Sequence, residues 1–292
     1  MSIEKFYFIH GDMFPPLPVH VLDYGSLPRY FKKPYANDFP AIAAVLRLST
    51  KYFIEHLRQR CLTRLEVDWP STLAGWDIRE REAIDHFGRY TPRDSCAHPI
   101  LAINLALELG LDSILPAAFY DLSRYGPSKI MSGASALPPV PYCSPPKITH
   151  QSVVRLSHDQ LCKTFIGRES AQHFVATFID KELKDRPVAR DCFNMDKITI
   201  RYCVESFYFI LLNILRSVGG IACGRDGDPL FTLIQAIEML SRTDFSDGVR
   251  QCGLKMCDRC KIDFAEAVGR AREEVWIRIP EWFGLQSPSG WK

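Results

Sequence analysis

Cys257 and Cys260, near the C-terminus, are the residues of this sequence with the clearest chemical potential. Their Cys-x2-Cys spacing allows two thiolates to bind one metal ion or to form a redox pair. Cys252 lies five positions upstream, and a helical pattern begins directly after Cys260. The spacing is a weak signal when it stands alone, so the chemistry depends on which other ligands join these two sulfurs.

A tetrahedral zinc ion requires four ligands, so two more donors are needed. The preferred donors are Cys192 and Cys203, which flank the expected start of a helix near Lys197. Cys252 is the main substitute, because it is close enough in sequence to loop back onto the same ion. Four cysteines would form a closed, structural zinc site. The alternative is four unlinked thiols in a reduced cell.

A thiol oxidoreductase that uses Cys257 and Cys260 is a third possibility. Such redox motifs normally follow a strand in a βαβ unit, and no such unit is detectable here. The sequence also lacks G-x-S-x-G, H-E-x-x-H and the kinase motifs. We therefore expect no catalytic residues, no cofactor apart from a possible structural zinc, and no enzymatic activity.

Hydrophobic periodicity predicts a predominantly α-helical protein with little or no β-sheet. Capping residues, prolines and glycines set the ends of the expected helices. These helices start at Phe39, near Thr50, at Pro99 (ending at Gly110), at Ser157, near Lys197 (ending at Gly219), at Pro229 and near Lys261 (ending near Pro280).

Proline-rich stretches divide the chain. Residues 1–38 form an irregular N-terminal segment with a short β-like run, Phe6–Ile9. Residues 39–131 are helical except for a charged loop from Asp77 to Asp94, and residues 132–153 contain five prolines and are the expected linker. Residues 154–285 form a C-terminal helical domain, and residues 286–292 form a tail.

Composition limits the partners and the compartment. The 292 residues carry 36 basic and 34 acidic side chains, a net charge of +2, which gives no reason to expect a nucleic-acid or membrane partner. The longest apolar stretch, Ser206 to Leu215, is too short to span a bilayer. No secretory signal pattern or disulfide framework is visible. We expect a reduced, intracellular protein, cytoplasmic or nuclear, whose partners are proteins.

Several segments resemble a known family. Residues 43–62, with Tyr52, Ile54 and the pair Leu57-Arg58, resemble the two C-terminal helices of a BTB/POZ domain. The segments 69–76, 100–109 and 115–122 resemble the region that follows this domain in a group of mushroom-type fungal BTB/POZ proteins. The Cys-x2-Cys pair, Trp276 and residues 279–285 also fit that region.

The resemblance implies an N-terminally truncated BTB remnant followed by BACK-like helices and a C-terminal helical domain. Only 40 residues precede Ala41, fewer than the strands and helices of a complete BTB domain would occupy. By family analogy, the protein would be a non-enzymatic scaffold or adaptor that presents partners for ubiquitination or transcriptional control. A zinc-stabilised regulatory module that uses the cysteine cluster is the alternative function.

Overall fold

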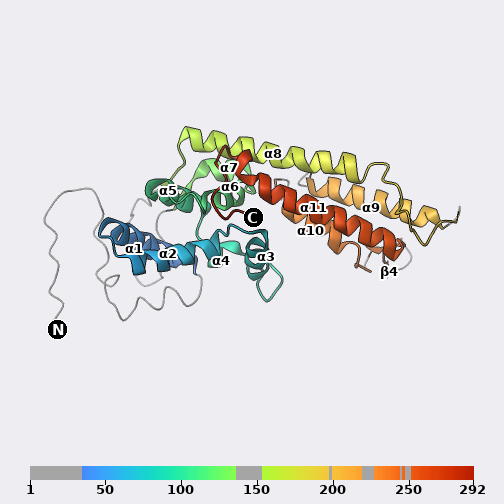
Figure 1. Ribbon diagram of the computed structural model, residues 1–292, viewed down its shortest axis with the longest axis horizontal. Coiled ribbons are helices and arrows are strands. Elements are labelled where there is room, and N and C mark those ends of the chain that lie inside the picture. Colours follow the sequence, from blue (N-terminus) through green and yellow to red (C-terminus); the bar gives the residue numbers. More distant parts are fainter. Residues whose placement is uncertain (1–34, 136–152, 197–198, 219–226, 244, 247–250) are drawn as a thin grey trace, which may run out of the picture.

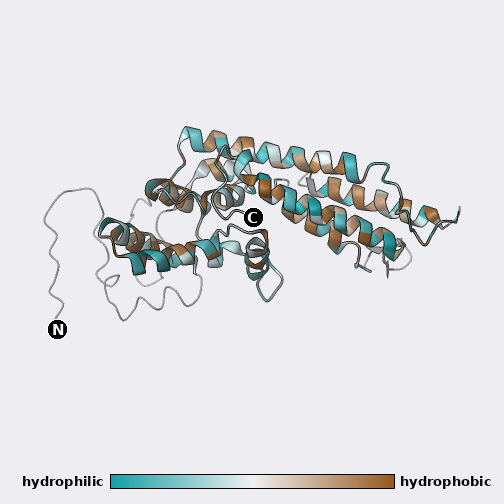
Figure 2. Cartoon of the chain, in the orientation of Figure 1, coloured by the Kyte–Doolittle hydropathy of each residue, from teal (hydrophilic) through white to brown (hydrophobic). Residues whose placement is uncertain are grey.

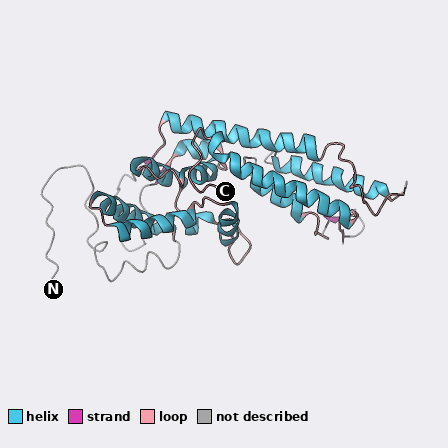
Figure 3. Cartoon of the chain, in the orientation of Figure 1, coloured by secondary structure: helices cyan, strands magenta, loops and turns pink. Residues whose placement is uncertain are grey.

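The computed structural model describes residues 35–135, 153–196, 199–218, 227–243, 245–246 and 251–292, with backbone only for 217–218, 245–246 and 251–252. Across these residues the protein is predominantly α-helical, as the sequence predicts (Figure 3). The helices are α1 (Phe39–Lys51), α2 (Glu55–Asp68), α3 (Leu73–Glu82), α4 (Pro92–Ser95), α5 (Pro99–Leu109), α6 (Leu115–Ser123), α7 (Pro127–Ser132), α8 (His158–Glu182), α9 (Ile200–Val218), α10 (Pro229–Glu238) and α11 (Asp258–Trp282).

The only β-structure among the described residues consists of short antiparallel pairs and one isolated bridge. Strand β1 (Ala134–Ser135) pairs with β2 (Val153–Val154), and β3 (Phe245–Ser246) pairs with β4 (Gln251–Cys252). Most of the expected linker, residues 136–152, lies outside the described residues, and so does the β-like run Phe6–Ile9. The β1–β2 pair shows that the two ends of the linker lie side by side.

The long helices α8 and α11 pack against each other (Figure 1), and α6 and α10 each contact both of them. Helix α10 packs against α8, α9 and α11, while α6 packs against α5, α8 and α11. One hydrophobic core extends from Phe39 to Phe283. The helical regions on either side of the expected linker therefore share a core. In the described part of the chain, no helix combines the length and apolar character needed to cross a bilayer.

Local signals explain where several helices start and stop. The Ser157 side chain accepts a hydrogen bond from the Gln160 backbone N–H, and the Ser157 N–H donates to Gln160 Oε1 at 2.7 Å, which completes the predicted capping box at the start of α8. Gly110 adopts φ 65° and ends α5 in the left-handed conformation that glycine tolerates. Asp228 caps α10 through the Phe231 N–H.

The predicted loop from Asp77 to Asp94 is wrong over its first third, because α3 continues to Glu82. Thr72 caps this helix by accepting a hydrogen bond from the Gly75 N–H. The many charged residues of this segment suggested a solvated loop, but Arg79 is buried and forms an ion pair with Asp121 at 2.6 Å. Because Asp121 neutralises the buried charge of Arg79, the charged segment can form helix α3.

The second predicted helix starts later than expected, at Glu55. Phe53, which lies within the helix expected from near Thr50, has φ 56° and is 90% exposed. The Ile54 N–H donates to the Ser49 carbonyl at 2.8 Å, which closes the end of α1 in the manner of a Schellman motif. Phe53 occupies the left-handed position that glycine usually takes.

Helix α11 begins at Asp258, three residues before the expected start, and continues through Pro280 to Trp282. A proline inside a helix has no N–H for the carbonyl four residues earlier. Here that carbonyl belongs to Trp276, and it accepts a hydrogen bond from Trp291 Nε1 at 2.8 Å. The indole of Trp291 also stacks on Trp276 with ring centroids 4.5 Å apart.

The C-terminal residues expected to form a tail are therefore packed against the core. Besides the Trp291 contacts, the Lys292 N–H donates to the Ser71 carbonyl at 3.1 Å. In the other direction, the Leu73 N–H donates to the Lys292 carbonyl at 3.2 Å. These bonds join the end of the chain to the start of α3.

Candidate metal centre

Three separate chain segments bring four cysteines to one end of the α8–α11 bundle. Cys192 lies in the loop after α8, and Cys203 lies in the first turn of α9. Cys257 is the N-cap of α11, and Cys260 lies in its first turn. The amino ends of two helices thus meet at the cluster, where their dipoles favour negatively charged sulfur.

The four sulfur atoms lie within 4.8 Å of one another. Cys192 Sγ is 3.6 Å from Cys257 Sγ and 3.8 Å from Cys203 Sγ. Zinc–sulfur bonds of about 2.3 Å in a tetrahedron place the sulfurs about 3.8 Å apart. The four sulfurs therefore have nearly the spacing that one tetrahedral ion requires. To reach it, the most widely separated sulfurs would have to approach each other by about 1 Å.

The protein surrounds these sulfurs with hydrogen-bond donors. The Ala189 N–H donates to Cys260 Sγ, and the Cys257 N–H donates to Cys203 Sγ, each at 3.4 Å. Asn194 contributes its backbone N–H to Cys192 Sγ at 3.3 Å and its Nδ2 to Cys203 Sγ at 3.4 Å. Donors of this kind stabilise thiolates and orient metal ligands.

Burial and hydrogen bonding give the thiols different acidities. Partial burial opposes ionisation of Cys257, but the backbone N–H groups of Cys260 and Phe193 and the neighbouring thiols outweigh it, so the pKa of Cys257 falls to about 6. Desolvation raises the pKa of both Cys192 and Cys260. Without a cation, one thiolate is favoured and its neighbours keep their protons, whereas a divalent cation would favour loss of those protons.

The accessibility of the cluster indicates a closed site. Cys203 and Cys260 are fully buried, Cys192 is 4% exposed, and Cys257 is half-buried. Four protein ligands fill a tetrahedral coordination sphere, which leaves no open position for a substrate or an activated water. Among these thiols only Cys257 is accessible enough for a reagent from solvent to approach it.

The structure brings together the four cysteines that the sequence singled out. Cys252, the substitute, lies in β4 with its backbone paired to Phe245, and its side chain is outside the described part of the structure. The donors Ala189 and Asn194 went unnoticed in the sequence. Ala189 donates a backbone N–H, which a residue of almost any type can do, so its identity carried no signal. The side-chain amide of Asn194, two residues after Cys192, was the one signal in the sequence for these donors.

A second polar cluster, which the sequence did not predict, lies buried where α3, α4, α6 and α10 meet. Asp121 is fully buried and pairs with Arg79, Arg93 and Arg124 at 2.6–2.7 Å. Burial alone would raise the pKa of Asp121, but the three guanidinium charges hold it well below its usual range. Arg124 also pairs with Asp228, the cap of α10, at 3.2 Å, so the cluster connects four helices.

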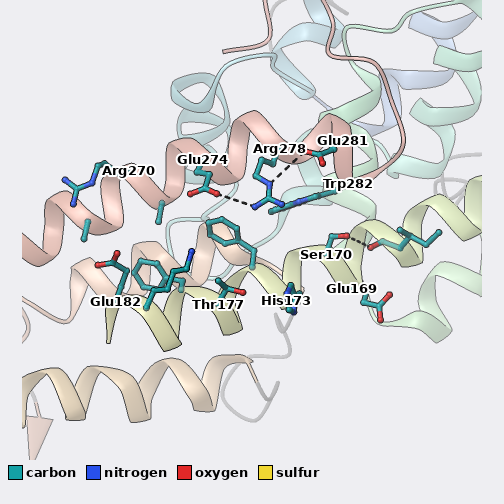
Figure 4. Close-up of a pocket in the computed structure, with 16 residues that line it drawn as sticks. Glu169, Ser170, His173, Thr177, Glu182, Arg270, Glu274, Arg278, Glu281 and Trp282 are labelled. Atoms are coloured by element: carbon teal, nitrogen blue, oxygen red, sulfur yellow. Dashed lines mark hydrogen bonds and ion pairs between the residues drawn. The ribbon is translucent and has the colours of Figure 1, made fainter. Parts of the chain in front are cut away.

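A groove of about 860 Å³ runs between α8 and α11 (Figure 4). Arg278 lies over it and pairs with Glu274 at 3.3 Å, while Trp282 forms part of its apolar lining. The Ser170 hydroxyl donates to the Ile166 carbonyl at 2.9 Å, so it is not engaged as a nucleophile by a base. The groove is amphipathic, with charges of both signs, and its lining indicates no particular chemistry.

No family model, no curated protein and no solved structure matches this chain. The geometry of the cysteine cluster is therefore the main basis for assigning a role to the protein.

Proposed function

We propose that this protein is a non-enzymatic interaction adaptor whose α8–α11 bundle is held at one end by a structural Zn²⁺ ion. Cys192, Cys203, Cys257 and Cys260 are the proposed ligands. The observation that carries the metal assignment is the convergence of four sulfurs within 4.8 Å from three chain segments. A sphere of four thiolates suits zinc, because soft sulfur ligands in tetrahedral geometry select this ion.

The role of the ion would be mechanical. Helix α9 contacts α8 and α10. It meets α11 through the rings of Phe207 and Phe264, whose centroids are 5.9 Å apart, and through the hydrogen bond from the Cys257 N–H to Cys203 Sγ. An ion bound to Cys203 of α9 and to Cys257 of α11 would join these helix ends directly. Because such a site forms only in the folded chain, the free energy of metal binding would add to the free energy of unfolding.

The adaptor role is supported by surface character and by the BTB/POZ resemblance of residues 43–62. Helix α9 exposes several large apolar side chains, among them Tyr208 (60% exposed) and Leu215 (46%). Exposed apolar surface of this kind is typical of protein interaction sites. The closed coordination sphere fits this role as well, because it leaves the ion no catalytic position.

One observation favours a second function, that of a thiol oxidoreductase. Cys257 is half-buried at a helix N-terminus with a pKa lowered to about 6, which are features of an attacking redox thiol. Cys260, three residues later, is buried with a raised pKa, as suits a resolving thiol. The proximity of Cys192 and Cys203 argues for the metal, since a redox pair needs only two sulfurs.

Metal analysis of the full chain tests the proposal. Protein purified under reducing conditions should contain one zinc per chain by inductively coupled plasma mass spectrometry. Cys203→Ser should lose the metal, while the control Cys162→Ser, which changes an exposed thiol in α8, should retain it. Free zinc a thousandfold above its Kd would stabilise the fold by about 4 kcal/mol. Chelation should then lower the Tm by roughly 7 °C, since a chain of this length unfolds with an entropy of about 0.6 kcal/mol/K.

Three outcomes separate the candidates. A chain that binds no zinc and melts identically with and without chelator would rule out the structural ion. Disulfide reduction that disappears in Cys257→Ser would favour the oxidoreductase. The adaptor role predicts that affinity capture followed by mass spectrometry recovers proteins that Cys162→Ser retains and that Cys203→Ser loses.

A further inference from the structure

Helix α9 is apolar on two sides. One side, which contains Cys203, Phe207, Ile210 and Ile214, is buried in the core. The other side exposes Val204 (49%), Tyr208 (60%), Leu212 (41%) and Leu215 (46%). A helix at the surface of a protein normally places polar residues on its outer side. Figure 2 shows hydrophobic residues along α9, which lies between α8 and α11 in the view of Figure 1.

The outer apolar residues have the spacing of a helix-pairing seam. Val204, Tyr208, Leu211 and Leu215 are separated by four, three and four positions, as the a and d residues of a heptad are. Leu211 is half-buried and packs partly on the core, so it lies at the border of the seam. Such a seam fits a second helix, and the charges beside it indicate which helix.

Glu205 lies beside the first turn of the seam and Arg216 beside the last, on the same flank. An antiparallel copy of α9, centred between Tyr208 and Leu211, places Val204 against Leu215 of the second copy. Glu205 then lies about 3 Å along the axis from Arg216 of the second copy, since two residues span that distance in a helix. A parallel copy would instead hold Glu205 about 16 Å along the axis from Arg216 of the second copy, because eleven residues then separate them. With Glu205 at one end and Arg216 at the other, the seams of two antiparallel copies therefore carry complementary charges.

The Glu205 carboxylate is available for such a pair. Its contact with Arg201 within α9 is long, at 3.9 Å, and both side chains are largely exposed (64% and 75%). Exposed pairs of this kind contribute little stability, so Glu205 can exchange its partner at little cost. Because a two-fold axis produces the contact twice, the dimer would contain two equivalent Glu205–Arg216 pairs.

We propose that α9 is a dimerisation helix, which pairs with a second copy of this chain as an antiparallel two-helix seam. The seam from Val204 to Leu215 is about 16 Å long. This is short for a permanent interface, which buries about 800 Å² on each partner. The dimer is therefore weak and forms at micromolar concentrations, on the order of 1–100 µM. This inference does not depend on the proposed zinc ion.

Sedimentation analysis of the full chain, from about 1 to 500 µM with zinc present, tests the dimer. Tyr208→Asp should weaken dimerisation at least about tenfold. The control Ile277→Asp, which changes an equally exposed residue of α11 (61%), should leave it unchanged. Circular dichroism of each variant establishes that the fold is retained. A monomer at every concentration would overturn the proposal, as would a dimer that Tyr208→Asp does not weaken.

Charge reversal tests the antiparallel register. Glu205→Arg and Arg216→Glu should each weaken the dimer, because each places like charges together. The double variant, Glu205→Arg with Arg216→Glu, should restore the wild-type dissociation constant to within about threefold. Single variants that weaken the dimer without rescue in the double variant would overturn the antiparallel arrangement.

Discussion

Two glycines in the long helices should respond in opposite ways to the same substitution. Gly167 in α8 faces the ring of Phe283, and a Cβ added there would lie within 2.7 Å of three ring carbons. Gly269 in α11 has no atom within 4 Å of the position its Cβ would take. Replacing glycine by alanine inside a helix stabilises it by about 0.5–1 kcal/mol when space permits.

The ring of Phe283 has no room to move. It is fully buried and stacks on Phe119 with centroids 5.7 Å apart. Ordinary contact begins near 3.4 Å and the nearest ring carbon would lie far inside that distance, so the ring would have to shift by more than 1 Å. Overpacking of a buried site costs about 1–3 kcal/mol or more, which exceeds the helix gain. Gly167→Ala should therefore destabilise the protein by about 2 kcal/mol, while Gly269→Ala should stabilise it by up to about 1 kcal/mol.

Urea unfolding followed by circular dichroism measures both changes as shifts of the midpoint at constant slope. Zinc content should be the same in both variants, because Phe283 and the Cys257 end of α11 are separated by about 37 Å of helix. A Gly167→Ala variant as stable as the wild type would refute the close contact between α8 and Phe283. A destabilised Gly269→Ala variant would refute the open environment of α11 at that position.

Three further substitutions test other features of the fold. Asp121→Asn leaves three arginines around a neutral side chain and should lower the free energy of unfolding by about 3–5 kcal/mol at pH 7. Because the folded pKa of Asp121 is depressed, the stabilisation by its carboxylate is present above about pH 4 and is lost as pH falls. The stability of the variant should therefore fall less steeply with acid than that of the wild type. Phe53→Gly should stabilise the protein by about 1 kcal/mol in thermal melts, since φ 56° strains phenylalanine and not glycine. Trp291→Ala should cost about 2–3 kcal/mol by the same measurement, because it removes the stack on Trp276 and leaves the Trp276 carbonyl without its donor. A Trp291→Ala variant with wild-type stability would contradict the packing of the C-terminus against the core.

The sequence by itself determined the fold class and most of the helices. Helix starts such as Ser157 and stops such as Gly110 are local signals, because the hydrogen bonds that cap a helix come from residues within one turn of its end. The pairing of Cys257 with Cys260 is local for the same reason. The sequence also reduced the partners of this pair to Cys192, Cys203 and Cys252.

Only the tertiary structure decided how distant residues meet. Arg79 and Asp121 are 42 residues apart, and without that pairing the charges of α3 resemble a solvated loop. Pro280 seemed a helix end in the sequence, yet Trp291 supplies the donor that lets the helix continue. Cys192 and Cys257 are separated by 65 residues, and their sulfurs meet at 3.6 Å because α8 ends where α9 and α11 begin. Such contacts depend on the packing of whole helices, which no short stretch of sequence encodes.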